Sequence, residues 1–341
     1  MKPRILLNGV GRIGKAIVRL AHETDAFEIT TINEINPNID SIAYTINYDS
    51  TYGTLTDKYV VKDNTLRNHH RIIRVLNHPS LDEADLSEID LIIDASGVKV
   101  DRDRTKKLDV EALFLTHPNT QADINVILGV NDDALDPRRH TLISTSSCNA
   151  TALLPLLRLI DDHTPILYGD ILTVHPLLSH QKVLDNGCVG SADRGVACNM
   201  EFGRSATQNI IPSRTTTIEA CSYVLPAFNA ERFASSSLRV PTPTVGAINV
   251  ALTVDKATSR KAIIAQCQTF AQTQHHDILL NNHAPLVSSD FQQERFTTIV
   301  DHRFTDVKMG KMVKLLVWYD NEWGYASKVV NIVEEYIRKS V

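Results

Sequence analysis

A thiol and an imidazole are the first residues whose types and surroundings point to chemistry. Cys148 lies in a stretch of small and hydroxylic residues, Ser144–Thr151, that leads directly into an apolar run. If that run is a helix, the backbone N–H groups at its start favour the thiolate, the nucleophilic form of cysteine. His175 ends a β-like run, Ile171–Val174, which could hold the imidazole beside the thiol. Such a pair is typical of covalent catalysis at a carbonyl carbon, although a lone cysteine is often only a buried hydrophobe.

The N-terminal stretch has the pattern of a dinucleotide-binding turn. A strand is expected at Arg4–Asn8, then the turn Gly9-Val10-Gly11-Arg12-Ile13-Gly14, then a helix over Lys15–His22. One glycine makes the tight turn, one lets the backbone approach a pyrophosphate, and one lets the helix pack on the strand. The alternative is a glycine-rich turn that only packs. The next expected strand, Phe27–Ile32, leads to Glu34, whose carboxylate can bind an adenosine ribose. No arginine follows it directly, which favours NAD over NADP, because a 2′-phosphate would be repelled.

Further apolar runs are expected to complete a parallel sheet in this half of the chain. They are Leu91–Ala95, Ala112–Leu115, Val126–Gly129 and Thr141–Ser144. Ligands of an open parallel sheet gather at the carboxyl ends of its strands, so Ser96 and Thr116 are expected to line the cofactor groove. They could instead be turn residues only. Residues 36–68 show no clear period and are expected to form loops and short strands.

The second half of the chain has a different character. A helix is expected at Ala152–Ile160, and β-rich runs at Ile166–Val174, Ser236–Val240, Val245–Val254 and Met312–Trp318. Long strands of this kind suggest a mainly antiparallel sheet packed on helices. We therefore expect an α/β Rossmann NAD-binding domain at residues 1–147 and an α+β catalytic domain at residues 148–320. Residues 321–341 are expected to form a C-terminal helix that packs back on the NAD-binding domain.

The amino-acid composition limits the kinds of molecule that this protein is expected to bind. The chain has 341 residues and a net charge of −5, with 43% hydrophobic and 22% charged residues. This balance is typical of a soluble protein with two cores and argues against a general affinity for nucleic acid or an anionic membrane. No signal peptide or spanning run is recognised, so we expect a cytoplasmic protein with a small-molecule partner. The five scattered cysteines signal neither a disulfide framework nor a metal site.

Seven motifs, in this order, resemble the glyceraldehyde-3-phosphate dehydrogenase family. They are Asn8–Gly14, Tyr48–Gly53, Ser147-Cys148, Val174-His175, Gln208–Pro212, Arg239–Thr242 and Trp318–Tyr325. The resemblance covers nearly the whole chain, and a close relative, erythrose-4-phosphate dehydrogenase, shares most of the motifs. Several motifs in one order are much more specific than any one of them, although family implies fold and chemistry more safely than substrate.

The resemblance implies NAD-dependent oxidation of a small phosphorylated aldehyde. Cys148 would add to the aldehyde to give a thiohemiacetal, which passes hydride to NAD and becomes a thioester. His175 would activate the thiol and then stabilise or protonate the developing oxygen. Inorganic phosphate or water would release the product. The family is usually a homotetramer, with its long loop, here Ser179–Arg214, at a subunit interface.

The same resemblance assigns the binding residues by motif position. Gly9, Gly11, Gly14, Arg12 and Ile13 would lie at the pyrophosphate, Glu34 at the ribose, and Asn321 at the nicotinamide carboxamide. Ser147, Asn149, Arg214, Thr215, Thr216 and Arg239 would bind the anionic groups of the substrate. No metal site is implied.

The anion-binding positions are where this sequence departs from the family. Asn149 replaces a threonine, Leu178 and His180 stand at two further threonine positions, and Phe202 replaces one of two arginines, the other being Arg204. Phe202 cannot bind an anion; Arg214 is a partial replacement. Loss of one charged hydrogen bond to phosphate removes about 1.5–3 kcal/mol.

Several interpretations therefore stay open. Arg239 and Arg214 could still hold a substrate phosphate while water releases the product, or the substrate could be another anionic aldehyde. A slipped alignment could instead place another arginine, such as Arg194, at the position of Phe202. Glyceraldehyde 3-phosphate is the first expectation and erythrose 4-phosphate the second. A binding or regulatory role without catalysis is the third.

Overall fold

The computed structural model describes residues 2–98, 100, 102–188 and 200–340. The described chain divides into two compact units, each of which is considered by itself. The first unit comprises residues 1–126, 133–146 and 326–341, and the second comprises residues 127–132 and 147–325. The first unit is thus built from both ends of the chain, while the second is almost continuous.

Among the described residues, nine strands form one sheet in the first unit, in the order β10-β11-β9-β8-β1-β2-β7-β6-β5. Their bounds are β1 Arg4–Asn8, β2 Glu28–Asn33, β5 Val60–Lys62, β6 Thr65–Arg67, β7 Ile72–Leu76, β8 Leu91–Asp94, β9 Ala112–Leu115, β10 Ile124–Asn125 and β11 Leu142–Ser144. All neighbours from β10 to β7 pair in parallel, and only β5 and β6 are antiparallel additions at one edge. The strands β8, β9 and β1 are apolar and buried because a parallel sheet is covered on both faces.

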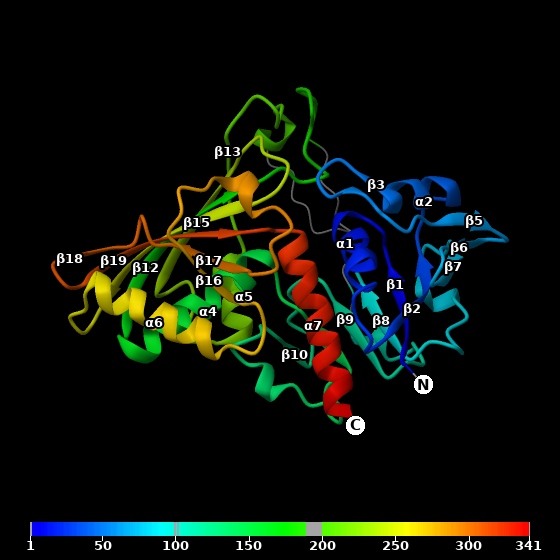
Figure 1. Cartoon of the computed structure of the whole chain (residues 1–341), viewed down its shortest axis with the longest axis horizontal. Helices are drawn as coiled ribbons and strands as arrows, with labels where there is room; N and C mark the ends of the chain where they lie inside the picture. Colours follow the sequence, from blue (N-terminus) through cyan, green and yellow to red (C-terminus); the bar gives the residue numbers. More distant parts are fainter. Residues whose placement is uncertain (1, 99, 101, 189–199, 341) are drawn as a thin grey trace. The chain divides into compact units, whose positions relative to one another are not determined.

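The connecting helices of this unit are α1 Arg12–Leu20, α2 Ile39–Asn47 and the short α3 Arg102–Thr105. A two-stranded antiparallel sheet, formed by β3 Tyr48–Asp49 and β4 Gly53–Thr54, follows α2 (Figure 1). The last helix, α7 Trp323–Ser340, belongs to this unit from Ala326 onward. Its Tyr336 ring meets Phe114 of β9 edge to face, with ring centroids 5.3 Å apart.

Two expectations for this half of the chain were wrong. The first is the expectation of loops and short strands across residues 36–68, which contain helix α2. Asn38 caps α2 by accepting a hydrogen bond from the Ser41 amide, and Ile42, Ala43 and Ile46 are buried on one face. Isoleucine, threonine and tyrosine are modest helix formers, so burial rather than intrinsic propensity explains this helix. The second is the strand expected at Val126–Gly129: the strand is Ile124–Asn125, and a turn follows in which Gly129 adopts φ +75°.

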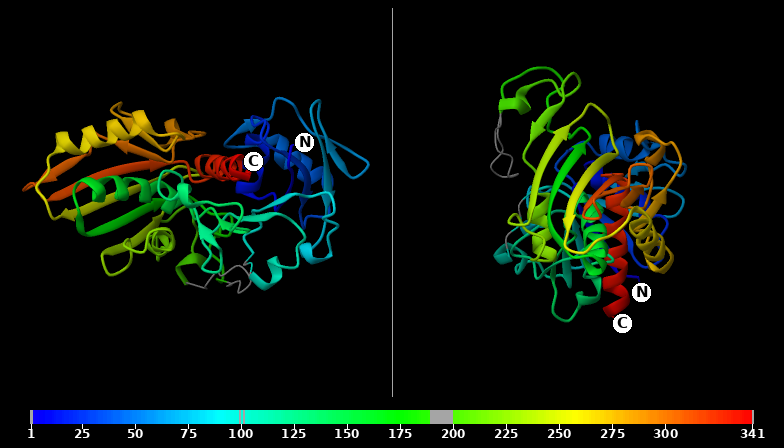
Figure 2. Two further views of the ribbon diagram at one scale, coloured as in Figure 1. Left: turned by 90° about the horizontal axis from the view of Figure 1, so that it is seen from below. Right: turned by 90° about the vertical axis from the view of Figure 1, so that its left-hand side faces the viewer.

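In the second unit, the described strands form a sheet in the order β13-β14-β12-β15-β19-β17-β16, with β18 also paired to β19. Their bounds are β12 Ile166–His175, β13 Ile211–Ser213, β14 Phe233–Arg239, β15 Gly246–Val254, β16 Leu279–Asn282, β17 Thr298–Asp301, β18 Asp306–Lys308 and β19 Met312–Tyr319. Only the β12–β14 and β16–β17 pairs are parallel. The right-hand view of Figure 2 shows β12, in green, between its two long neighbours. The expected fold class, a Rossmann-like unit and a mainly antiparallel α+β unit, is confirmed.

Three helices of this unit pack on one face of its sheet. They are α4 Cys148–His163, α5 Thr217–Val224 and α6 Arg260–Thr273. Alternate residues of the strands, such as Ile171 and Val250, join these helices in one buried core. Thr173 and His175 alternate with half-buried Leu172 and Val174 along β12, so His175 lies on the helix-covered face. Among the described residues, no helix is long and apolar enough to span a membrane.

Candidate active site

The thiol lies at the first residue of α4. Ser147 is the N-cap, with its Oγ accepting a hydrogen bond from the Ala150 amide at 3.3 Å. The preceding residue, Ser146, adopts φ +61°, an uncommon conformation for a residue that is not glycine. The helix begins at Cys148, four residues earlier than the expected start at Ala152, because small polar residues can cap and open a helix without being apolar. Ser147 uses its hydroxyl oxygen as a helix cap.

The imidazole of His175 lies beside this thiol. Cys148 Sγ and His175 Nε2 are 3.8 Å apart, and His175 Nδ1 is 2.9 Å from the Pro176 carbonyl oxygen. A carbonyl can only accept, so Nδ1 carries the proton and Nε2 presents its lone pair to the sulfur. The structure thus brings together the two residues that the sequence singled out, with the histidine in the tautomer that a general base requires.

Burial controls the protonation of both residues. It raises the pKa of Cys148 to about 11, while nearby Arg239 and the backbone amides of Asn149 and Cys148 act in the opposite direction. It also lowers the pKa of His175 to about 3, and the positive charge of Arg239 adds to this. Both pKa shifts favour the neutral forms of the thiol and the imidazole. The backbone amides at the start of α4 thus favour the thiolate, as expected, but burial opposes them and raises the pKa of the thiol on balance.

Arg239 supplies the positive charge of the site. It is paired with His175 in the register between β14 and β12, at the end of both strands. Its Nε and Nη1 atoms are buried and have no hydrogen-bond partner among the described residues. Burial lowers the pKa of this guanidinium, opposed by Tyr319 and Cys148. A half-buried guanidinium with unused donors fits an anionic group of a ligand, because unpaired buried donors are otherwise costly.

Asn321 follows β19 in the sequence, but its side chain contacts the two residues that directly precede β15. Its Oδ1 accepts hydrogen bonds from Thr244 Oγ1 and from the Val245 amide, both at 3.1 Å. Val245 has φ +66°, which is strained for a β-branched residue and costs on the order of 1–3 kcal/mol. With the oxygen so held, the amide nitrogen is the group of Asn321 that could meet a carboxamide.

The remaining anion-site candidates are dispersed. Arg214 and Thr216 are exposed, whereas the Thr215 hydroxyl is 2.6 Å from that of Thr217. Arg204 forms an ion pair with Asp185 at 3.1 Å. The Phe202 ring packs edge to face on His180, with centroids 6.1 Å apart. Leu178 is half-buried, and Arg194 lies outside the described residues. Only Arg239 therefore lies beside the thiol–imidazole pair with unused donors, among the arginines that the structure describes.

The glycine turn of the first unit has the geometry that a pyrophosphate needs. Gly9 adopts φ +90°, and an added Cβ would lie 2.7 Å from Ser96 Cα. A Cβ on Gly14 would lie 2.1 Å from the Gly9 carbonyl oxygen, whereas nothing lies within 4 Å of one on Gly11. Arg12 and Ile13 begin α1 directly after this open position. Glu34 Oε2 accepts a hydrogen bond from the Val10 amide at 2.7 Å, which places its carboxylate at the turn.

We expect Gly14→Ala to lower the free energy of unfolding by about 1–3 kcal/mol, because its methyl group must displace backbone. Gly11→Ala is the matched control and should cost less than about 1 kcal/mol, since its methyl group meets open space. Urea unfolding measures both. NAD titration should show weaker binding in each variant. Equal stability of the two variants would contradict the packing role of Gly14.

Ser96 and Thr116 lie, as expected, just after β8 and β9. Ser96 Oγ donates to Asp94 Oδ1 at 2.6 Å, and Thr116 Oγ1 donates to the Asp94 carbonyl at 2.9 Å. Sequence reasoning missed the next residue, His117. Both of its ring nitrogens are buried without a partner in the described chain, and burial lowers its pKa. Its position directly after a parallel strand was the available signal, so His117 joins the candidates for the cofactor groove.

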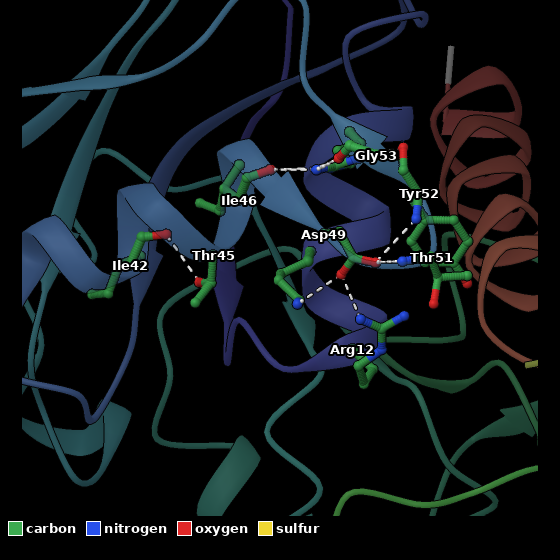
Figure 3. Close-up of polar contacts among 10 residues, drawn as sticks. Arg12, Ile42, Thr45, Ile46, Asp49, Thr51, Tyr52 and Gly53 are labelled. Atoms are coloured by element: carbon green, nitrogen blue, oxygen red, sulfur yellow. Dashed lines mark hydrogen bonds and ion pairs between the residues drawn. The ribbon is translucent and has the colours of Figure 1, made fainter. Parts of the chain in front are cut away.

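A cluster around Asp49 fixes the loop after α2 to the start of α1. The Asp49 carboxylate pairs with Arg12 and with Lys15, the latter at 3.0 Å, and accepts hydrogen bonds from the Thr51 and Tyr52 amides (Figure 3). Burial alone would raise the pKa of Asp49, but the Lys15 and backbone hydrogen bonds and the charge of Arg12 hold it well below its usual range. The Arg12 side chain is thus engaged by Asp49 within this cluster.

Replacing Asp49 by asparagine should therefore lower the free energy of unfolding by about 1–3 kcal/mol at pH 7. A carboxylate with a lowered pKa stabilises the fold above its unfolded pKa, and this contribution is lost as pH falls. The difference between wild type and Asp49→Asn should be constant from about pH 8 to 5 and shrink below about pH 4. Urea unfolding checks both points. Asp25→Asn, which removes an exposed pair with Lys2, should change stability little; equal losses would refute the argument.

Comparison with known proteins gives the family. The family model "Glyceraldehyde 3-phosphate dehydrogenase, C-terminal domain" matches residues 147–321, which include the thiol, the imidazole and Arg239. The model "Glyceraldehyde 3-phosphate dehydrogenase, NAD binding domain" matches residues 3–102. The chain belongs to the glyceraldehyde 3-phosphate dehydrogenase family. Glyceraldehyde-3-phosphate dehydrogenase 2 of Bacillus subtilis (strain 168) is 28% identical over 340 residues, covering 98% of this chain and 96% of that protein.

Membership in the glyceraldehyde 3-phosphate dehydrogenase family makes this chain an NAD-dependent dehydrogenase. The residues present fit NAD: the open backbone at Gly11 suits a pyrophosphate, and the Glu34 carboxylate lies at the same turn. In the part of the chain that the structure describes, no group of histidine, cysteine and acidic side chains is arranged to hold a metal ion. The family resemblance drawn from the seven motifs is thus confirmed.

Proposed function

We propose that this protein oxidises a small phosphorylated aldehyde, most simply glyceraldehyde 3-phosphate, through a covalent intermediate on Cys148. The observation that carries the proposal is the placement of the Cys148 sulfur 3.8 Å from Nε2 of His175, whose other ring nitrogen is fixed as a donor. A non-catalytic role would not require the nucleophile, the tautomer and the unpaired guanidinium of Arg239 together. Residues 1–147 would bind NAD, and residues 148–320 would carry the chemistry.

The geometry supports a stepwise reaction. The thiol passes its proton to His175 Nε2 as the sulfur attacks the aldehyde carbon, so that an S–C bond forms and the carbonyl π bond breaks. The backbone amides of Cys148 and Asn149, which favour the thiolate, would also stabilise the developing oxygen. When bound, NAD accepts the hydride that the aldehyde carbon loses. His175 returns the thiol proton to the developing oxygen, which gives the thiohemiacetal hydroxyl, and takes that proton up again as the carbonyl re-forms with loss of the hydride, leaving a thioester.

Arg239 would hold the anionic group of the aldehyde. Its unused donors lie at the end of β14, in register with His175. The second anion position of the family is altered here, since Phe202 and His180 pack together and Arg204 is paired with Asp185. This favours a weak inorganic-phosphate site and hydrolytic release of the thioester. Erythrose 4-phosphate, or another anionic aldehyde, is therefore the second candidate substrate.

We further propose that the protein forms a homotetramer and acts in the cytoplasm. The face of the second unit's sheet opposite its helices carries half-buried apolar residues, among them Leu172, Val174, Leu238 and Leu316. Such a face is suited to a second copy of the chain. Neither nucleic acid nor a membrane is proposed as a partner.

The test is NADH formation by the purified protein with glyceraldehyde 3-phosphate and with erythrose 4-phosphate, each with and without inorganic phosphate. Phosphate-dependent turnover of the triose would support two working anion sites and a glycolytic role. Turnover of either aldehyde without phosphate would support hydrolytic release. If neither aldehyde is oxidised while NAD still binds, the proposed substrate class is wrong.

A further inference from the structure

His117 follows strand β9, at the carboxyl edge of the sheet of the first unit. Its carbonyl oxygen accepts a hydrogen bond from Ser144 Oγ at 2.8 Å, so the backbone of this residue is tied to the neighbouring strand β11. Both ring nitrogens are buried, but neither has a hydrogen-bond partner among the described residues. Buried nitrogens without partners are costly, so we expect a bound molecule to complete their hydrogen bonds.

The other polar side chains at this edge of the sheet satisfy one another. Asp94, Asn8 and Asn33 are the last residues of the adjacent strands β8, β1 and β2. Asn8 Nδ2 donates to Asp94 Oδ2 at 3.1 Å, and Asn33 Nδ2 donates to Asn8 Oδ1 at 2.8 Å. Asp94 Oδ1 accepts hydrogen bonds from the amide and the hydroxyl of Ser96. His117 differs from this row, because its ring nitrogens are not used within the described chain.

The strand order places His117 on one side of the glycine turn. The turn follows β1 and Glu34 follows β2, whereas Ser96 and His117 follow β8 and β9, on the other side of β1. A dinucleotide lies across the point where the strand order reverses, with its pyrophosphate at the turn. If Glu34 binds the adenosine ribose, the second ribose must lie toward β8 and β9. Adjacent strands are about 4.8 Å apart, so β9 ends about 10 Å from the end of β1, on the side of that second ribose.

The imidazole of His117 is suited to a hydroxyl group rather than to a phosphate. Burial lowers its pKa and so keeps the ring neutral near pH 7, although the charge of Asp94 acts in the opposite direction. A neutral imidazole offers one donor and one acceptor. Ribose hydroxyls both donate and accept, whereas a phosphate only accepts and would be repelled by the nearby carboxylate.

We propose that His117 hydrogen-bonds the hydroxyl groups of the ribose on the nicotinamide side of NAD. It would act on the opposite side of the pyrophosphate from Glu34, so that side chains at one edge of the sheet hold both riboses. The inference rests on NAD binding by the first unit and does not depend on which aldehyde is oxidised.

The experiment measures the dissociation constants of NAD, ADP-ribose and ADP by calorimetric titration of the whole protein. ADP-ribose keeps the second ribose but lacks nicotinamide, and ADP lacks both. In His117→Leu we expect NAD and ADP-ribose to bind about 3- to 10-fold more weakly, while ADP binds as it does to wild type. His117→Gln supplies one donor group and one acceptor and should retain most of the affinity.

His70→Leu is the matched control, because His70 is exposed and lies just before β7, at the opposite edge of the sheet. It should leave all three constants unchanged. Three results in His117→Leu would overturn the inference. Equal weakening of ADP and ADP-ribose would mean a contact with the pyrophosphate or a disturbed fold. Weakening of NAD alone would mean a contact with nicotinamide, and unchanged binding of all three would mean that buried water completes the hydrogen bonds of the imidazole. Because these titrations need no aldehyde, absence of turnover in the substrate assay would count against the proposed function and leave this inference standing.

Discussion

Cys148→Ser is expected to reduce NADH formation by at least about 10⁴-fold while leaving NAD binding unchanged. Serine is nearly the same size, so the start of α4 and the Ser147 cap should persist. A hydroxyl is far less acidic than a thiol and a far weaker nucleophile, and nothing near residue 148 would activate it beyond a neutral imidazole. Steady-state kinetics measures the loss, and calorimetric titration with NAD measures binding.

Cys188→Ser is the matched control for this substitution. Cys188 is half-buried and lies outside the proposed machinery, so its replacement should keep full activity. More than about one per cent of wild-type turnover in Cys148→Ser would contradict the covalent route. Loss of NAD binding together with turnover would instead show that the substitution disturbed the fold.

The second large effect is expected for His175→Asn. Asparagine can keep a hydrogen bond to the Pro176 carbonyl but offers no base to the sulfur at 3.8 Å. Loss of general acid–base catalysis should lower kcat/KM by about 10²–10⁴-fold. In wild type the imidazole is neutral above a pKa of about 3, so no loss of activity caused by its protonation is expected between pH 8 and pH 5. A wild-type acid limb near pH 6.5 that disappears in His175→Asn would contradict this.

The same residue should influence stability. Its folded pKa lies below the ordinary value near 6.5, so the unfolded chain binds the proton first, and the contribution of His175 to stability is lost as pH falls below about 6.5. Between about pH 6 and pH 4, the free energy of unfolding of wild type should fall more steeply than that of His175→Asn, by about 1.4 kcal/mol per pH unit. Other buried histidines, such as His117 and His302, are present in both proteins and cancel. Parallel curves in urea would refute the burial of a neutral imidazole.

The parts of the fold that the sequence predicted well are those with long, regular patterns. The strand ending at His175 and the helix after Cys148 were predicted because their apolar runs extend over many residues. Helix α2 was missed because its residues have modest helix propensity and are buried by neighbours distant in sequence. One such neighbour is Arg19, which donates to the Ile46 carbonyl at 2.8 Å. Local pattern cannot reveal a helix that tertiary contacts stabilise.

In the candidate site, too, some features were predictable from the sequence and others were not. The pairing of Cys148 with His175 was predictable from residue type and family motifs, whereas the state of the thiol was not. The pKa of that thiol depends on burial and on Arg239, and the side chain of the next residue, Asn149, is held by Tyr319 from 170 positions away. Hydrogen bonds between distant segments have no signature in a single sequence. The altered anion positions were visible as substitutions, but the packing of Phe202 on His180 required the structure.

The division of the chain into units has a consequence for biosynthesis. The second unit is continuous from residue 147 to residue 325, apart from a short segment supplied by residues 127–132. The first unit needs residues from 326 onward, whose Tyr336 packs on Phe114 and whose Lys339 binds the Leu135 carbonyl at 3.2 Å. Although its glycine turn is among the first segments translated, the cofactor-binding unit can be completed only after the whole of the second unit has left the ribosome. The nine strands of its sheet all lie before residue 145, so the nascent chain carries that sheet with apolar surface around β9 uncovered until α7 has been translated.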